Sequence, residues 1–184
     1  EIKRREETEH EYINFVTLIN ENASLFEISD AVLKQIVSTA KFDIGVFYVY
    51  DGDKFIQTAY YGLNNEAPSN EIIENIYFKV LETKEPVEFI FAENKPILKT
   101  SLTTLKLEYI IIYPILFNKE IIGVLELSAI YKPKINTISY LDSIIEQLSI
   151  GLSNAIAYER QKDLVKELRL LNEQYQVQNS KIKE

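Results

Sequence analysis

The sequence of 184 residues contains no cysteine, no methionine and no tryptophan, and it has a single histidine and five glycines. Without cysteine the chain can form no disulfide and no thiolate metal site, and thiol catalysis is excluded. The glycines form no phosphate-binding loop, and the G-x-S-x-G, H-E-x-x-H and Walker motifs are absent from the sequence. We therefore expect no enzymatic activity in this part of the protein.

Two further absences limit the expected partners. No apolar run approaches the roughly 20 residues that a membrane-spanning helix needs, and no secretory signal pattern occurs. We therefore expect a cytoplasmic protein without direct membrane insertion. The net charge of −8 and the isoelectric point near 4.9 repel polyanions, so nucleic acid is not an expected partner.

The composition is that of a globular domain, with 46% hydrophobic and 26% charged residues. The length suffices for one domain with helical extensions. Because the sequence starts at Glu1 and not at a methionine, we expect a covalently linked output domain in a longer protein.

Two helices are predicted before any strand. In residues 1–20, a seam of side chains recurs at steps of three and four, the heptad spacing of a helix, although two of its six positions are charged. Ser24 and Glu27 form a capping-box pattern, and the apolar stripe that follows predicts a second helix ending near Lys41.

The next segments indicate a hairpin and a helix. Residues 44–50 and 55–61 are β-branched and aromatic runs, and the turn residues between them favour an antiparallel pair. Helical spacing returns at residues 72–81 and stops before Pro86.

The second half of the chain begins with residues 87–91, which indicate a short strand. Residues 92–106 are rich in threonine and poor in apolar residues, so we expect a loop there, with room for a turn of helix, and the best candidate for a mobile lid. Residues 109–117 and 121–130 form a second predicted hairpin, whose near-continuous hydrophobicity indicates a sheet covered on both faces. Ser139 is the expected start of the last helix.

Beyond residue 157 the apolar stripe of the last helix narrows to a coiled-coil seam, in which residues recur at alternating steps of four and three. Such a seam is exposed on a lone helix, so we expect a parallel homodimer. The predicted dimer interface comprises Tyr12, Val16, Ile19, Leu164, Leu168, Leu171, Tyr175 and Ile182. The whole order of elements predicts an α+β fold with an antiparallel sheet of five to six strands between helical layers.

Four segments of the sequence, through their motifs and their order along the chain, resemble the GAF domains. Residues 113–127, YPILFNKEIIGVLEL, resemble the family's apolar hairpin, and Gly62 with Leu63 resembles its "Gl" step. Residues 80–87 are similar to its "vletgePv" segment, with Lys84 where glycine is usual, and residues 139–155 are similar to its last helix. The resemblance covers residues 24–157, preceded by a signalling helix at 1–23 and followed by a coiled-coil signalling helix at 158–184.

The resemblance implies a regulatory small-molecule sensor of a bacterial signal-transduction protein, such as a histidine kinase, a diguanylate cyclase or a chemoreceptor. It implies that the terminal helices pack on one face of the sheet, and that loops and a short helix cover a ligand pocket on the other. The loop side corresponds to residues 64–81 and 92–106. The candidate pocket residues are Tyr48, Tyr50, Tyr60, Phe78, Phe89, Phe91, Tyr113 and Glu126.

The ligand itself is left open. We expect no haem, metal or bilin, because the chain has no cysteine and its one histidine, His10, precedes the globular part. His10 is followed by Glu11 and Asn14, as in a phosphoacceptor helix, but we interpret it as an exposed side chain. A cyclic nucleotide is an open alternative for the ligand. For the whole domain, the alternatives are a ligand-free dimerisation and spacer module, a PAS-type sensor, and a small-molecule enzyme on a related fold.

Overall fold

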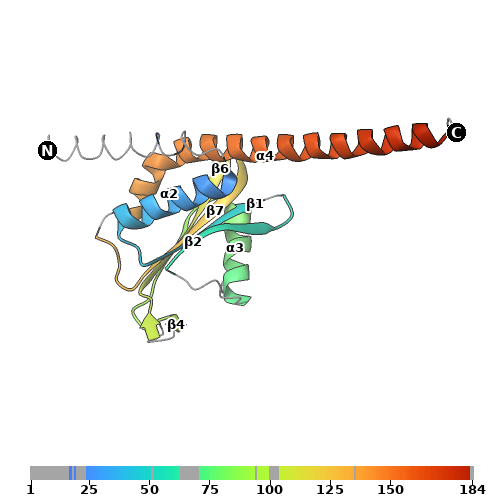
Figure 1. The fold of residues 1–184 in the computed structure, drawn as a ribbon. Helices are drawn as coiled ribbons and strands as arrows, with labels where there is room; N and C mark the ends of the chain where they lie inside the picture. The colour runs from blue at the N-terminus through green and yellow to red at the C-terminus, as the bar shows by residue number, and fades with distance from the viewer. Residues whose placement is uncertain are drawn as a thin grey trace.

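A computed structural model describes residues 17, 19, 24–50, 52–62, 71–93, 95–99, 104–134 and 136–182. Five strands form an antiparallel sheet in the order β2-β1-β7-β6-β3. α2 (Leu25–Ala40) and α4 (Thr137–Ile182) cover one face of this sheet, and α3 (Glu71–Thr83) lies against the other (Figure 1). The predicted α+β fold, with helical layers on both faces, is confirmed.

The two predicted hairpins form the centre of the sheet. β1 (Ile44–Tyr50) pairs with β2 (Phe55–Tyr61), and β6 (Tyr109–Phe117) pairs with β7 (Glu120–Ala129). β1 also pairs with β7, and β3 (Val87–Ile90) adds an edge strand to β6. Strands β6 and β7 are therefore internal to the sheet, and both of their faces are apolar because α2 and α4 pack on one face and α3 on the other.

The predicted capping box begins α2. The backbone N–H of Glu27 donates to Ser24 Oγ at 3.2 Å, and the backbone N–H of Ser24 donates to Glu27 Oε2 at 3.2 Å. The apolar stripe of this helix includes Val32, Leu33 and Ile36, all fully buried. It packs with α4 on the sheet to form the larger of two hydrophobic cores.

α4 joins this core through its first half only. Leu141, Leu148 and Leu152 are fully buried, and Ala155 is the last buried residue of the helix. At Gly151 an added Cβ atom would lie 2.1 Å from Ile19 Cγ2, so the glycine allows the chain around Ile19 to approach α4 closely. Ile19 is only 7% exposed and belongs to the larger core.

The smaller core lies between α3 and the sheet and contains Val80, Ile112, Ile121 and Val124. α3 ends at Thr83, and the backbone N–H of the next residue, Lys84, donates to Val80 O at 2.8 Å. Lys84 has a φ of 56°, in the left-handed region that favours glycine, and glycine is the usual GAF residue at this position.

Two predictions about local structure are wrong. Residues 92–106 are not simply a loop, because β4 (Ile97–Lys99) and β5 (Thr104–Lys106) form a separate antiparallel pair within them. α4 begins at Thr137 and not at Ser139, since the Asn136 side chain accepts the backbone N–H of Ser139 at 3.2 Å and caps the helix two residues earlier than expected.

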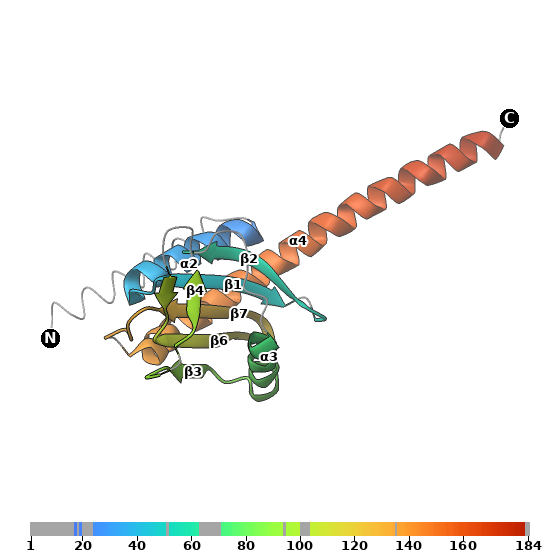
Figure 2. The ribbon, with the colours of Figure 1, turned by 90° about the horizontal axis from the view of Figure 1, so that it is seen from below.

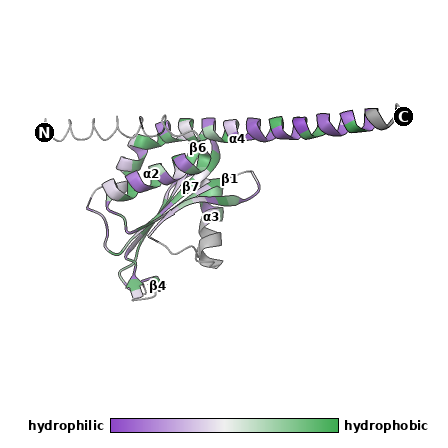
Figure 3. Cartoon of the chain, viewed as in Figure 1, coloured by the Kyte–Doolittle hydropathy of each residue, from purple (hydrophilic) through white to green (hydrophobic). Residues whose placement is uncertain are grey.

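The second half of α4 projects far beyond the sheet as one continuous helix (Figure 2). Hydrophilic and hydrophobic residues are interspersed along this projecting part (Figure 3). From Tyr158 to Asn179 its side chains are exposed, except for the half-buried Glu159. Within the described part of the chain, no helix has the length and apolarity needed to cross a membrane.

Candidate functional site

Strand pairing assigns the predicted site residues to faces of the sheet. Val46 pairs with Tyr60 on one side and with Glu126 on the other, so Tyr60 and Glu126 share a face. Glu126 also pairs with Ile112, which packs in the smaller core under α3. This surface, the α3 face, therefore carries Tyr60 and Glu126, and the two-residue alternation of β1 adds Tyr48 and Tyr50 to it.

Glu126 is the one acidic residue within the apolar stretch of β7 from Ile121 to Ala129, and it accepts a hydrogen bond from α3. The Tyr77 hydroxyl donates to Glu126 Oε2 at 2.5 Å, which connects the helix to the sheet. The Tyr77 ring packs on Tyr48, with centroids 5.5 Å apart, and on Phe55, 5.3 Å apart. Tyr50 continues the group, with its ring 5.0 Å from that of Phe55. We call these five residues the Glu126 cluster.

Burial controls the electrostatics of the cluster. Burial raises the pKa of the Glu126 carboxyl above its ordinary value, and the hydrogen bond from Tyr77 opposes this shift. Burial also raises the pKa of Tyr77 and of Tyr48, and the negative charge of Glu126 raises both further. Both tyrosines therefore remain neutral hydrogen-bond donors at physiological pH, next to a carboxyl group that is poorly solvated.

The structure brings only some of the predicted pocket residues together. Tyr48, Tyr50 and Glu126 belong to the Glu126 cluster, and Tyr60 lies on the same face but on the edge strand β2, where it is 40% exposed. Phe89 shares the row of Ile110 on β6, and it stacks on Phe91 with centroids 6.1 Å apart. These two rings form a pair near the β3 edge, outside the cluster.

Two of the predicted pocket residues lie elsewhere. Tyr113 is on the opposite face, in the larger core, and its hydroxyl donates to Asp142 of α4. The alternation of β6 places it there, because its neighbour Ile112 faces α3. Phe78 is 67% exposed on α3 and contributes nothing to either core. Neither residue belongs to the candidate site.

Two members of the Glu126 cluster, Phe55 and Tyr77, were not among the predicted pocket residues. Tyr77 follows the apolar stripe of residues 72–81, since Tyr77, Val80 and Leu81 have helical spacing, and all three pack in the smaller core. Phe78 next to it lies off this stripe. The spacing therefore contained the signal that separates the two aromatic residues.

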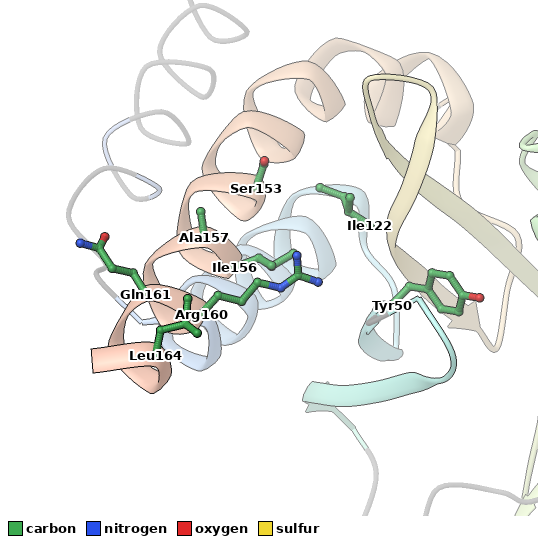
Figure 4. A pocket seen from close by; sticks show the side chains of 8 residues that line it. All are labelled: Tyr50, Ile122, Ser153, Ile156, Ala157, Arg160, Gln161 and Leu164. Carbon is green, nitrogen blue, oxygen red and sulfur yellow. The ribbon is translucent and has the colours of Figure 1, made fainter. Parts of the chain in front are cut away.

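A groove of about 450 Å³ lies where α4 leaves the sheet (Figure 4). Its lining is Tyr50, Ile122, Ser153, Ile156, Ala157, Arg160, Gln161 and Leu164. In Figure 4 the Tyr50 ring is directed away from the α4 side chains, which agrees with its contact with Phe55. Tyr50 therefore contributes both to the groove and to the Glu126 cluster.

The predicted dimer residues fall into three groups. Leu164, Leu168, Leu171 and Tyr175 are between 51% and 64% exposed on α4. Ile19, in contrast, is buried against Gly151 of its own chain and has little surface left for a partner. Tyr12, Val16 and the side chain of Ile182 lie outside the described residues.

A group of three or more histidine, cysteine, aspartate or glutamate side chains placed to hold a metal ion does not occur among the described residues. The expectation that the protein has no metal, haem or bilin stays a prediction.

No protein-family model matches the chain, and no curated protein matches it. Among solved structures, it is similar to the GAF domain of a phosphoenolpyruvate-protein phosphotransferase from Acinetobacter, at 21% identity and a TM-score of 0.64, over 80% of this chain and 93% of that one. The GAF domain of a putative sensor histidine kinase from Pseudomonas syringae pv. tomato gives 12% identity and a TM-score of 0.55, over 91% of this chain and 95% of that one.

A third similar structure is the free methionine-R-sulfoxide reductase from Neisseria meningitidis, in complex with its substrate, with 13% identity and a TM-score of 0.61 over 82% of this chain and 90% of that one. The fold of this chain is therefore a GAF fold. The predicted resemblance is confirmed at the level of the fold.

Proposed function

We propose that this chain is the regulatory sensor module of a bacterial signal-transduction protein, such as a histidine kinase, a diguanylate cyclase or a chemoreceptor. In this proposal a small molecule binds on the α3 face, and the chain forms a parallel homodimer through α4, which transmits the change to an output domain. The module is regulatory and not catalytic, since it has no cysteine and no catalytic motif.

The exposed seam of α4 carries this proposal. Leu164, Leu168, Leu171 and Tyr175 recur at steps of four and three, and each exposes more than half of its surface in the single chain. Full burial of one such side chain is worth about 1.5–3 kcal/mol, which pairing with the same stripe of a second copy would recover.

The groove where α4 leaves the sheet supports a connection between ligand binding on the α3 face and dimerisation through α4. Tyr50 lines the groove beside Arg160 and Leu164, and its ring contacts Phe55 in the Glu126 cluster. A ligand that moves the rings on the α3 face would therefore move a side chain packed at the start of the dimer seam. Such a coupling requires that the ligand bind the two arrangements with different affinity.

The test of the dimer is sedimentation of Leu168→Asp, with Leu170→Asp as the matched control. Both leucines are exposed on α4, but only Leu168 is on the seam. Each dimer would lose two buried leucines, at least about 3 kcal/mol in total, which corresponds to roughly 100-fold weaker association. We expect Leu168→Asp to sediment as a monomer and Leu170→Asp as a dimer. An unchanged dimer in both variants would contradict the seam.

A second candidate function is a ligand-free dimerisation and spacer module. The observation that favours it is the dense packing of the Glu126 cluster, where neighbouring ring centroids are 5.0–6.4 Å apart. Native mass spectrometry of protein purified from cells, before and after denaturation, separates the two candidates. A dimer that retains a small molecule supports the sensor, whereas a dimer that never binds one supports the spacer.

A further inference from the structure

Glu126 is a carboxylate without a cationic partner in the described part of the chain. None of the ion pairs found there includes it, and its only hydrogen bond there is the one from Tyr77 to Oε2. The sequence from residue 55 to residue 78, which includes β2 and Tyr77, contains no lysine, arginine or histidine. Among the described residues, Glu126 therefore forms no ion pair, and the segment that carries Phe55 and Tyr77 adds no positive charge between residues 55 and 78.

The surroundings of this carboxylate are aromatic. Tyr48, Tyr50, Phe55 and Tyr77 gather on the same face, and all four are only partly buried, as is Glu126 itself. Aromatic faces attract cations through their quadrupole, and a cluster of rings next to a carboxylate is an arrangement suited to an ammonium group. The described residues form no hydrogen bond to Oε1 of Glu126, since the Tyr77 hydroxyl donates to Oε2, and a carboxylate oxygen of this kind can accept one from an ammonium group.

From this juxtaposition we infer that the Glu126 cluster binds a small alkylammonium group, as the ligand-recognising part of the proposed sensor site. The inference rests on the proposed function only in naming this site as the sensor's. The ammonium N–H donates to Glu126, and the alkyl part packs on the rings of Tyr48 and Tyr77. Because Tyr77 on α3 donates to the other oxygen of the same carboxylate, binding of the ammonium group alters the contact between the helix and the sheet.

Three probes with one carbon skeleton test the charge requirement. They are 3-methylbutylamine, which is an ammonium ion at pH 7, the neutral 3-methyl-1-butanol, and the anion 3-methylbutanoate. Each is titrated into the full chain and followed by protein-observed NMR. We expect the ammonium ion to bind about tenfold more tightly than either other probe, with shifts centred on Tyr48, Tyr77 and Glu126.

Two variants locate the effect. Glu126→Gln removes the charge and keeps the shape, so it should weaken binding of the ammonium ion about tenfold or more. The matched control is Glu88→Gln, because Glu88 also accepts a hydrogen bond from a tyrosine, Tyr109, at the β3 edge outside the cluster. Glu88→Gln should bind as the wild type does.

Three results would overturn the inference. These are equal binding of the alcohol, an affinity for the ammonium ion that Glu126→Gln leaves unchanged, and no binding of the ammonium ion at all. If the alcohol or the carboxylate binds at the same residues, the ammonium inference fails while ligand binding by the sensor stands. An intact dimer in Leu168→Asp would instead refute the proposed signalling seam, whatever the titration gives.

Discussion

The close approach of Ile19 to Gly151 predicts that Gly151→Ala changes the free energy of unfolding in opposite directions with and without the Ile19 side chain. In the wild-type background, Gly151→Ala adds a Cβ atom 2.1 Å from Ile19 Cγ2, whereas ordinary contact begins at 3.4 Å, so one side must move by at least 1.3 Å. Overpacking of this kind costs about 1–3 kcal/mol. Alanine, however, stabilises a helix interior by about 1 kcal/mol relative to glycine. The free energy of unfolding should therefore decrease by roughly 0–2 kcal/mol.

In an Ile19→Ala background the same substitution should stabilise the protein. The Cγ2 atom is then absent, and the remaining Cβ of residue 19 lies at an ordinary 3.5 Å from the new Cβ. Only the helix-propensity gain of about 1 kcal/mol remains. The coupling energy between the two positions is thus about 1–3 kcal/mol.

Urea unfolding of the four proteins, followed by circular dichroism at one protein concentration, measures all corners of this double-mutant cycle. Ile19→Ala alone should cost about 2–5 kcal/mol, which provides an independent check that the side chain is buried. A stabilising effect of Gly151→Ala in both backgrounds would refute the placement of Ile19 against α4.

Two further predictions concern the cap of α2 and the charge of Glu126. Ser24→Ala removes the side chain that accepts the Glu27 backbone N–H, so it should lower the free energy of unfolding in urea by about 1 kcal/mol. The control is Ser38→Ala, at an exposed position of the same helix, which should change the free energy of unfolding by less than about 0.5 kcal/mol. Because the folded-state pKa of Glu126 is raised, its protonated form stabilises the fold below pH 4.5 and this contribution is lost as the pH rises through the folded-state pKa. Among the described residues, the titratable groups that face Glu126 are Tyr77 and Tyr48, which stay neutral. The stability of the wild type relative to Glu126→Gln should therefore fall as the pH is raised from 4 to neutral. A difference that does not vary with pH would contradict the burial of this carboxyl.

Local patterns in the sequence predicted most of the fold. The β-branched and aromatic runs gave β1 and β2 their bounds, and the pattern of Ser24 and Glu27 identified the start of α2. β4 and β5 were missed because each has three residues, too few for an alternation to be recognised. The threonines of residues 92–106, together with Pro96, are equally typical of a loop.

The site was harder to predict because its geometry depends on contacts between distant segments. Alternation separates Tyr113 from Ile112, yet it does not say which of them faces the helices. That choice follows from the packing of α4, through Asp142, against β6. The contact of Ile19 with Gly151 also joins segments that are far apart in the sequence. From the sequence alone, a glycine in a helix predicts only lower helix stability, and its role in allowing a close contact is seen only in the structure.

The uninterrupted form of α4 makes it a mechanical lever. The 28 residues from Ala155 to Ile182 span about 40 Å, and no glycine or proline among them provides a hinge. A tilt of about 5° where the helix leaves the sheet would therefore displace its far end sideways by roughly 3–4 Å. A rearrangement too small to alter the sheet would thus become a displacement of several ångström at the end of the helix.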